Sequence, residues 1–185
     1  LSAIKSIGRP VIEGIVRERE EHGEYTSLKT FVERNIDQIN KRVVENLIKA
    51  GALDCLEGNR KQKMTIYTQI IDSINQDKKH TMAGQLSLFD IASEEDKKEF
   101  EIRMPQVEEY PKEIILTFEK EVLGIYLSGH PLERYRNMME KMISAKTSDF
   151  QPDDETGIPE VYDNQKVIVG GMITDKNIKY TKNNK

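Results

Sequence analysis

A polar turn occurs twice near the start of the chain, and this repeat constrains the fold more than any other feature of the sequence. The first turn ends at Gly8-Arg9-Pro10 and the second ends at Asn40-Lys41-Arg42. Apolar residues then recur at helical spacing, first at Val11, Ile12, Ile15 and Val16, and later at Val43, Val44, Leu47 and Ile48. Because residues with this spacing lie on one side of a helix, residues 1–51 are predicted to form two helix–turn–helix units, roughly 30 residues apart.

Local signals in the first unit indicate where its helices begin and end. Pro10 suits the first turn of a helix, where its missing N–H costs nothing. The polar run from Arg17 to Gly23 is expected to end that helix. Ser27 is a good N-cap, and it predicts a short helix through Leu28, Phe31 and Val32.

Two further helices are predicted before residue 80. One runs over Lys41–Ala50 and is ended by Gly51. Ala52–Leu56 is expected to form a short apolar plug against the helices before it. Asn59 can cap a long helix over about 60–79, whose apolar side would carry Ile66, Ile70, Ile71 and Ile74.

The middle of the chain has a different composition. Residues 81–111 contain Gly84, Pro105 and Pro111 and a dense acidic stretch, which predicts a flexible or loosely docked linker. Within it, Gln85-Leu86-Ser87-Leu88-Phe89 is an apolar cluster. Such a peptide suits docking into the pocket of a partner protein, with Leu88 and Phe89 in the pocket. Its chemistry fits equally well a segment that folds back on the helices.

The remaining sequence predicts two helices and a β segment. One helix covers about 112–127 and is stopped by Ser128-Gly129-His130-Pro131, and the other covers Leu132–Ile143. After a polar connector over 144–164, Lys166–Thr174 and Ile178–Thr181 are typical of β-strands. Two strands alone are marginally stable, so the β part is expected to be incomplete.

The predicted fold class is therefore mainly α, with two helix–turn–helix units, further helices, a linker and a truncated β segment at the C-terminus. The expected segments are the paired helical units over 1–58, a helix over 59–80, an acidic linker over 81–111, a helical connector over 112–145 and the first strands of the β segment over 160–185.

The two turns have the chemistry of a phosphate site. A helix–hairpin–helix unit holds DNA through backbone N–H groups at the start of its second helix, aided by the positive end of the helix dipole. Such contacts fix position without reading sequence. The candidate nucleic-acid-binding residues are Lys5, Ile7, Gly8 and Arg9 in the first hairpin and Ile39, Asn40, Lys41 and Arg42 in the second. The alternative, that the turns only reverse the chain and the basic residues are solvated, stays open.

Composition argues against several functional classes. No apolar run is long enough to span a bilayer, and a net charge of -4 argues against a surface coated for nonspecific DNA binding. The single cysteine, Cys55, rules out an internal disulfide and is expected to be a buried small hydrophobe in a reducing compartment, which indicates the cytoplasm. His130 is expected to cap or pack, and the runs of carboxylates are expected to be solvated. No catalytic or metal site is predicted.

The paired turns resemble the tandem helix–hairpin–helix domain of DNA polymerases and repair proteins. Ser6 stands where the usual hairpin has its first glycine, and the second hairpin has no glycine. Gln85–Phe89 is similar at every position to the motif by which bacterial polymerases and repair proteins bind the β sliding clamp. In order along the chain, the segments resemble the α subunit of bacterial DNA polymerase III, a replicative C-family polymerase; the matching stretches are 40–54, 85–89, 119–132 and 167–174.

This resemblance implies that residues 1–58 are a tandem helix–hairpin–helix DNA-binding domain and that residues 160–185 are the first strands of an OB-fold. It also implies a parent that is a DNA-directed DNA polymerase, a nucleotidyltransferase of chromosomal DNA replication that uses Mg²⁺. The chain itself is expected to be a non-catalytic fragment without a cofactor, because the family's catalytic aspartates belong to a palm domain that would precede Leu1. The implied partners are double-stranded DNA, the β sliding clamp, other replisome subunits and, through a complete OB-fold, single-stranded DNA, with no membrane.

Two other functions remain open from the sequence. One is a clamp-associated DNA-repair protein with a helix–hairpin–helix module in a nuclease or scaffold context. The other is an acidic helical interaction module without a DNA role. Measurable affinity for duplex DNA at low salt separates the second alternative from the others.

Overall fold

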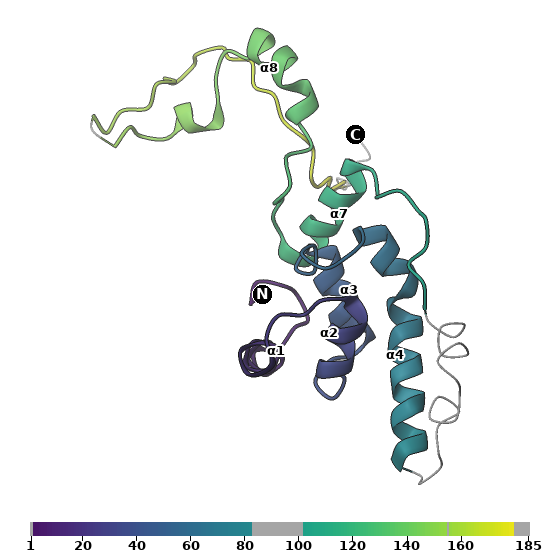
Figure 1. The fold of residues 1–185 in the computed structure, drawn as a ribbon. Coiled ribbons are helices and arrows are strands. Elements are labelled where there is room, and N and C mark those ends of the chain that lie inside the picture. Colours follow the sequence, from purple (N-terminus) through teal and green to yellow (C-terminus); the bar gives the residue numbers. More distant parts are fainter. Residues whose placement is uncertain (1, 83–101, 155, 180–185) are drawn as a thin grey trace. The chain divides into compact units, whose positions relative to one another are not determined.

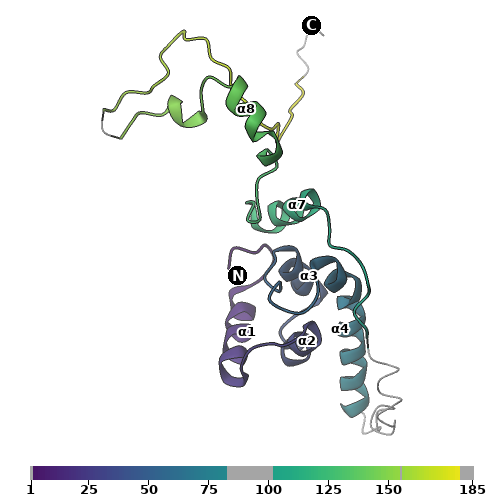
Figure 2. The same cartoon turned by 45° about the horizontal axis from the view of Figure 1, so that its top comes forward.

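The computed structural model describes residues 2–82, 102–154 and 156–179, which belong to two compact units, Leu1–Ser128 and Gly129–Lys185 (Figures 1 and 2). These residues contain six α-helices and two short 3-10 helices, and they form no β-strand. None of the helices in these ranges is long and apolar enough to cross a membrane.

Helices α1 and α2 form at the predicted places. Helix α1 spans Arg9–His22, with Pro10 in its first turn, and α2 spans Leu28–Asn35, with the Ser27 hydroxyl accepting a hydrogen bond from the Thr30 N–H. The polar run over residues 17–23 ends the first helix as predicted, since α1 continues to His22 and ends at Gly23, where φ is 81°. The carboxylate of Glu18 holds this last part, since both its oxygens bind the guanidinium of Arg34 on α2.

Helices α3 and α4 form at the predicted places, with the predicted stop at Gly51 and the predicted cap at Asn59. Helix α3 spans Lys41–Lys49, the Asn40 side chain accepts a hydrogen bond from the Val43 N–H, and Gly51 follows in the left-handed region at φ 75°. Helix α4 spans Arg60–Met82, and the Asn59 side chain accepts from the Gln62 N–H. In Figures 1 and 2, α4 lies beside α2 and α3.

The two helix–turn–helix units of residues 1–51 correspond to each other position by position, with an offset of 32 residues. Gly8 and Asn40 are the N-caps of α1 and α3, and Gly14 corresponds to Asn46. The Asn46 amide donates a hydrogen bond to the Lys5 carbonyl at 2.8 Å, so α3 holds the first turn. Reciprocally, the Gln38 carboxamide of the second turn lies directly over Gly14 of α1, where a Cβ would overlap it. Each turn is therefore supported by the other unit's helix.

One hydrophobic core fills the first unit. Its buried side chains come from all five described helices of Leu1–Ser128 and from the turns between them: Ile4, Ile7, Ile15, Leu28, Phe31, Val32, Ile36, Ile39, Val43, Val44, Leu47, Ile48, Ile66, Ile70, Ile71, Ile74 and Val122. Leu53 and Leu56 join this core, which confirms the predicted plug. Cys55 between them is exposed, so the expectation of a buried thiol is wrong. In the short turns after Gly51, only some side chains can face the core at once.

Residues 102–111, which the sequence places in a flexible or loosely docked linker, are bound to the start of α4. The Asn59 amide donates to the Val107 carbonyl at 2.9 Å, and the Gln62 amide donates to the Pro105 carbonyl at 2.7 Å. The Glu109 carboxylate accepts from the backbone N–H groups of Arg60 and Lys61 at 2.8 and 3.1 Å. A carboxylate at a helix N-terminus accepts hydrogen bonds from the open N–H groups there and complements the helix dipole. This contact orders the segment, and it cannot be predicted from the sequence of the segment alone.

Helix α7 spans Lys112–Leu123 and ends at Gly124 in the left-handed region, before the predicted end at 127. Its buried face consists of Leu116, Glu119 and Val122, one residue per turn. Ile114 on this helix and Ile125 just after it are exposed by 40% and 56%. The buried face of α7 thus carries a carboxylate, while two isoleucines lie at the surface.

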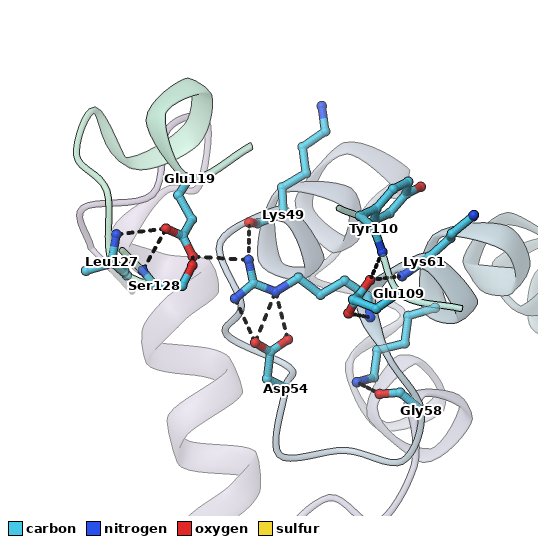
Figure 3. A network of polar contacts seen from close by, with 11 residues as sticks. Lys49, Asp54, Gly58, Lys61, Glu109, Tyr110, Glu119, Leu127 and Ser128 are labelled. Atoms are coloured by element: carbon cyan, nitrogen blue, oxygen red, sulfur yellow. Dashed lines mark hydrogen bonds and ion pairs between the residues drawn. The ribbon is translucent and has the colours of Figure 1, made fainter. Parts of the chain in front are cut away.

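That carboxylate belongs to a buried ion-pair network (Figure 3). Glu119 is fully buried and accepts from the Leu127 and Ser128 N–H groups at 2.7 and 2.9 Å, from the Ser128 hydroxyl, and from the Arg60 guanidinium at 3.3 Å. Arg60 also binds the Asp54 carboxylate at 2.7 Å and the Lys49 carbonyl at 3.2 Å. A single guanidinium therefore joins α4, the end of α3, the plug and α7.

The second unit is mostly irregular. The predicted helix over 132–143 is divided into a 3-10 turn, Glu133–Tyr135, and α8, Arg136–Met142; a second 3-10 turn covers Thr147–Phe150. Residues 166–179 form no strand, so the predicted OB-fold segment is not confirmed. Their backbone contacts residues 144 and 145: the Ile168 carbonyl accepts from the Ser144 and Ala145 N–H groups at 2.9 and 3.4 Å, and the Ile168 N–H donates to the Ser144 hydroxyl at 2.9 Å. A strand needs a paired neighbour, and no partner strand exists among the described residues. The His130 ring accepts a hydrogen bond from the Leu132 N–H at 3.2 Å, a contact within the turn that precedes Glu133–Tyr135.

The Glu119 network yields a stability prediction. Glu119→Gln replaces a charged acceptor by a neutral amide among donors, and we expect the free energy of unfolding to fall by about 3 kcal/mol. Glu121→Gln on the same helix is the matched control, since the exposed Glu121 carboxylate pairs with Lys49 at the surface. It should cost less than about 1 kcal/mol. Urea unfolding measures both variants, and equal losses would contradict the assigned role of Glu119.

The same network predicts an acid-sensitive stability. Burial alone would raise the pKa of Glu119, but hydrogen bonds from Ser128 and Leu127 and from Arg60 outweigh it and hold this pKa below its ordinary 4.5. A carboxylate whose pKa falls on folding adds stability above its unfolded-state pKa and loses it as the pH drops through the folded-state value. The free energy of unfolding should therefore decline below about pH 4.5, and less so in Glu119→Gln. Identical pH profiles in urea titrations would count against this.

Candidate nucleic-acid interface

The first bend, residues 4–9, is a fixed structure in front of α1. Ser6 has φ 63°, in the left-handed region that a non-glycine residue seldom occupies. The bend is held at Lys5, whose N–H donates to the Val122 carbonyl at 2.8 Å and whose carbonyl accepts from Asn46. Ile4 and Ile7 bury their side chains in the core. Ile7, a predicted DNA-binding residue, can therefore offer only its backbone.

The first bend presents a row of open backbone donors. Within the described part of the chain, no acceptor receives the N–H groups of Ser6, Ile7, Gly8 or Arg9. Gly8 is the N-cap of α1 and has no side chain to occupy these donors. Adjacent N–H groups at the positive end of a helix form a site for an anion such as a phosphate.

The second bend, residues 36–42, differs in its donors. The Asn35 carbonyl accepts from the N–H groups of Gln38 and Ile39 at 2.9 and 3.2 Å, so Ile39, with its side chain also buried, has little left to offer a phosphate. The N–H groups of Asn40, Lys41 and Arg42 find no acceptor among the described residues. These three lie at the start of α3 and form the second candidate anion site.

The charged side chains of the bends differ in their surroundings. Lys5 and Arg42 are exposed and have no ion-pair partner within the described ranges. Arg9 pairs at 2.8 Å with Glu13, one turn along the same helix, and its side chain is 88% exposed. Lys41 instead pairs at 2.7 Å with Asp72 of α4. The predicted basic residues thus all lie at the surface, and two of them already face a carboxylate.

Sequence reasoning missed the acidic and basic residues that α4 and the loop place around the second bend. Asp37 binds the Lys78 ammonium group at 2.7 Å, and Asp72 binds Lys41. These partners are 41 and 31 positions apart along the chain, so no local pattern could have paired them. Only the packing of α4 against α2 and α3 brings them together.

The predicted clamp-binding peptide lies outside the described residues; it consists of Gln85, Leu86, Ser87, Leu88 and Phe89. In the described ranges, no group of three or more His, Cys, Asp or Glu side chains is arranged to hold a metal ion. The buried Lys63 donates to the Gly58 carbonyl, and burial lowers its pKa. It faces the core and not a cleft.

Comparison with known proteins agrees with the geometry. Residues 1–63 match the family described as the helix-hairpin-helix motif. The chain is 34% identical over 153 residues to the DNA polymerase III subunit alpha of Chlamydia pneumoniae, and 37% identical over 145 residues to that of Borreliella burgdorferi. These matches cover 82% and 78% of the chain but 12% and 13% of the relatives.

A third relative extends the match. The DNA polymerase III subunit alpha of Vibrio cholerae is 31% identical over 183 residues, which is 98% of the chain and 15% of that protein. The chain therefore spans a small part of the length of the curated relatives it matches. The resemblance derived from the sequence is confirmed.

Proposed function

Because this chain is similar over most of its length to a segment of bacterial DNA polymerase III α subunits, we propose that it is the duplex-binding and clamp-tethering part of such a polymerase. In this role it binds double-stranded DNA during chromosomal replication and takes no part in the chemistry. The observation that carries the proposal is the pair of helix starts with open backbone N–H groups, one at Gly8 and one at Asn40, within residues that match a helix-hairpin-helix motif.

The proposed contact is electrostatic and independent of sequence. Backbone N–H groups at each bend bind a phosphate oxygen, and Lys5, Arg9 and Arg42 supply positive charge around it. Phosphate contacts fix the position of a duplex without reading its bases, which suits a polymerase that must move along any template. A net charge of -4 favours binding at such local sites over binding across the whole surface.

We further propose that Gln85–Phe89 binds the β sliding clamp. The support is the sequence itself, since the peptide is similar at every position to the clamp-binding motif of bacterial polymerases. Leu88 and Phe89 would enter an apolar pocket of the clamp, and the Gln85 amide would form a hydrogen bond at its edge. Tethering to a ring on DNA raises the effective concentration of the weak duplex contact.

Catalysis is assigned to other parts of the longer protein. Nucleotidyl transfer needs Mg²⁺ held by carboxylates on a rigid scaffold. In this proposal, other parts of the polymerase supply the site of that reaction, the contacts with other replisome subunits and a complete OB-fold for single-stranded DNA. The polymerase acts in the cytoplasm. A clamp-associated repair protein is the second candidate, but the match of 98% of the chain to a polymerase subunit extends far beyond residues 1–63 and favours the polymerase.

The duplex contact is tested by charge reversal. Lys5→Glu with Arg9→Glu should weaken binding of a short duplex at least tenfold at low salt, and should reduce the slope of log K against log salt by roughly 2 because two phosphate contacts are lost. Fluorescence anisotropy over a salt series measures both quantities. Arg17→Glu with Lys29→Glu, the same charge change away from the bends, should have a much smaller effect. A wild-type chain without duplex affinity at low salt would refute the proposal.

The clamp contact is tested separately. Leu88→Ala with Phe89→Ala should remove binding of the chain to purified β clamp, because the two side chains that fill the pocket are lost, while duplex affinity stays unchanged. Surface plasmon resonance with immobilised clamp gives the readout. Ile91→Ala, an apolar truncation just beyond the peptide, is the control. Equal clamp affinity of the wild type and the double variant would remove the tether from the proposed function.

A further inference from the structure

We propose that helix α4 sets the strength of the second bend as a phosphate site, with Asp72 competing with DNA for Lys41 and Lys78 neutralising Asp37. This inference rests on the proposed duplex binding and concerns which of its two sites dominates. It makes the two bends unequal: the first is available at all times, and the second engages DNA only when a phosphate displaces a carboxylate.

The competition follows from the position of Asp72. Its carboxylate oxygens lie 2.7 and 2.8 Å from the Lys41 ammonium group, at the start of α3, where the open N–H groups of Asn40, Lys41 and Arg42 are found. A bound phosphate would need the same ammonium group. The Asp72 and Lys41 side chains are 56% and 49% exposed, and an exposed pair of this kind is weak enough for DNA to break.

The second ion pair, between Asp37 and Lys78, has the opposite effect on DNA binding at the second bend. Asp37 lies within the bend itself, is 84% exposed, and would repel a phosphate. The Lys78 ammonium group binds both its oxygens, at 2.8 and 2.7 Å. Lys78 therefore favours DNA at the second bend by cancelling a negative charge, whereas Asp72 disfavours it by occupying a positive one. Asp72 and Lys78 both lie on α4. A variant that only disturbed the helix would therefore shift DNA affinity in the same direction at both positions, and would not give the opposite effects expected here.

The first bend has no such partner from another helix. Within the described residues, Lys5 has no ion pair, and Arg9 pairs only with Glu13 of its own helix. With 88% of its side chain exposed, Arg9 can turn toward a phosphate without breaking a contact between helices. The first bend also has four adjacent open N–H groups and the second has three, which further favours phosphate binding at the first bend.

The test compares two variants with opposite expected signs. Asp72→Asn frees Lys41 and should tighten duplex binding about three- to tenfold at low salt, with a salt slope steeper by about 0.9 for one added phosphate contact. Lys78→Ala exposes the Asp37 charge and should weaken binding by a similar factor. Anisotropy with a short duplex measures both, and thermal melts check that each variant is folded.

The matched control is Glu121→Gln. Glu121 is also 56% exposed and pairs at 3.0 Å with Lys49, at the opposite end of α3, so the variant makes the same charge change without touching either bend. A gain in Asp72→Asn that exceeds this control, and that disappears in a Lys41→Ala background, supports the inference.

Other outcomes overturn it. If Asp72→Asn binds duplex like Glu121→Gln, or if Asp72→Asn and Lys78→Ala shift affinity in the same direction, α4 does not act through these charges. The proposed duplex binding would survive such a result, provided that Lys5→Glu with Arg9→Glu still weakens binding. A wild-type chain without duplex affinity would instead refute both.

Discussion

The compact unit Leu1–Ser128 depends on the hydrogen bonds and ion pairs of the buried Arg60 guanidinium. This guanidinium binds the fully buried Glu119 of α7, the Asp54 carboxylate and the last carbonyl of α3. Removing one partner from a buried ion pair leaves a charge without compensation, so these segments are stable only together. Glu109 adds a second link at the same place by binding the first N–H groups of α4. Residues 102–128 thereby become part of the helical domain.

This network also reaches the candidate DNA interface. Helix α7 accepts the Lys5 N–H at the Val122 carbonyl, and α3 holds the Lys5 carbonyl through Asn46. The first bend is therefore supported on both sides by helices that Arg60 joins. A backbone phosphate site needs donors held in place before the ligand arrives, since ordering them on binding would cost conformational entropy. The rigid scaffold explains how a short loop with a non-glycine residue at positive φ can present four open donors.

The sequence predicted most of the helical part and less of the rest. The caps at Ser27 and Asn59 and the stop at Gly51 were correct because capping is a contact between neighbours in sequence. The sequence left open whether residues 102–111 are docked, and it wrongly buried Cys55, because contacts between distant residues decide both. It also placed the end of α7 at 127 and not at Gly124. For the candidate site, the chain positions of both bends were predicted, but the buried side chains of Ile7 and Ile39 and the carboxylates facing the second bend were not.

The sequence by itself determined the repeated helical units, their caps and the family to which the chain is similar, because periodicity, capping and motif order are properties of the linear chain. Only the tertiary structure decided which donors stay open, which basic residues are already paired and which carboxylate is buried. These depend on Coulombic and hydrogen-bond contacts between residues far apart in sequence, such as Asp72 with Lys41 and Arg60 with Glu119, and such contacts exist only once the helices have packed.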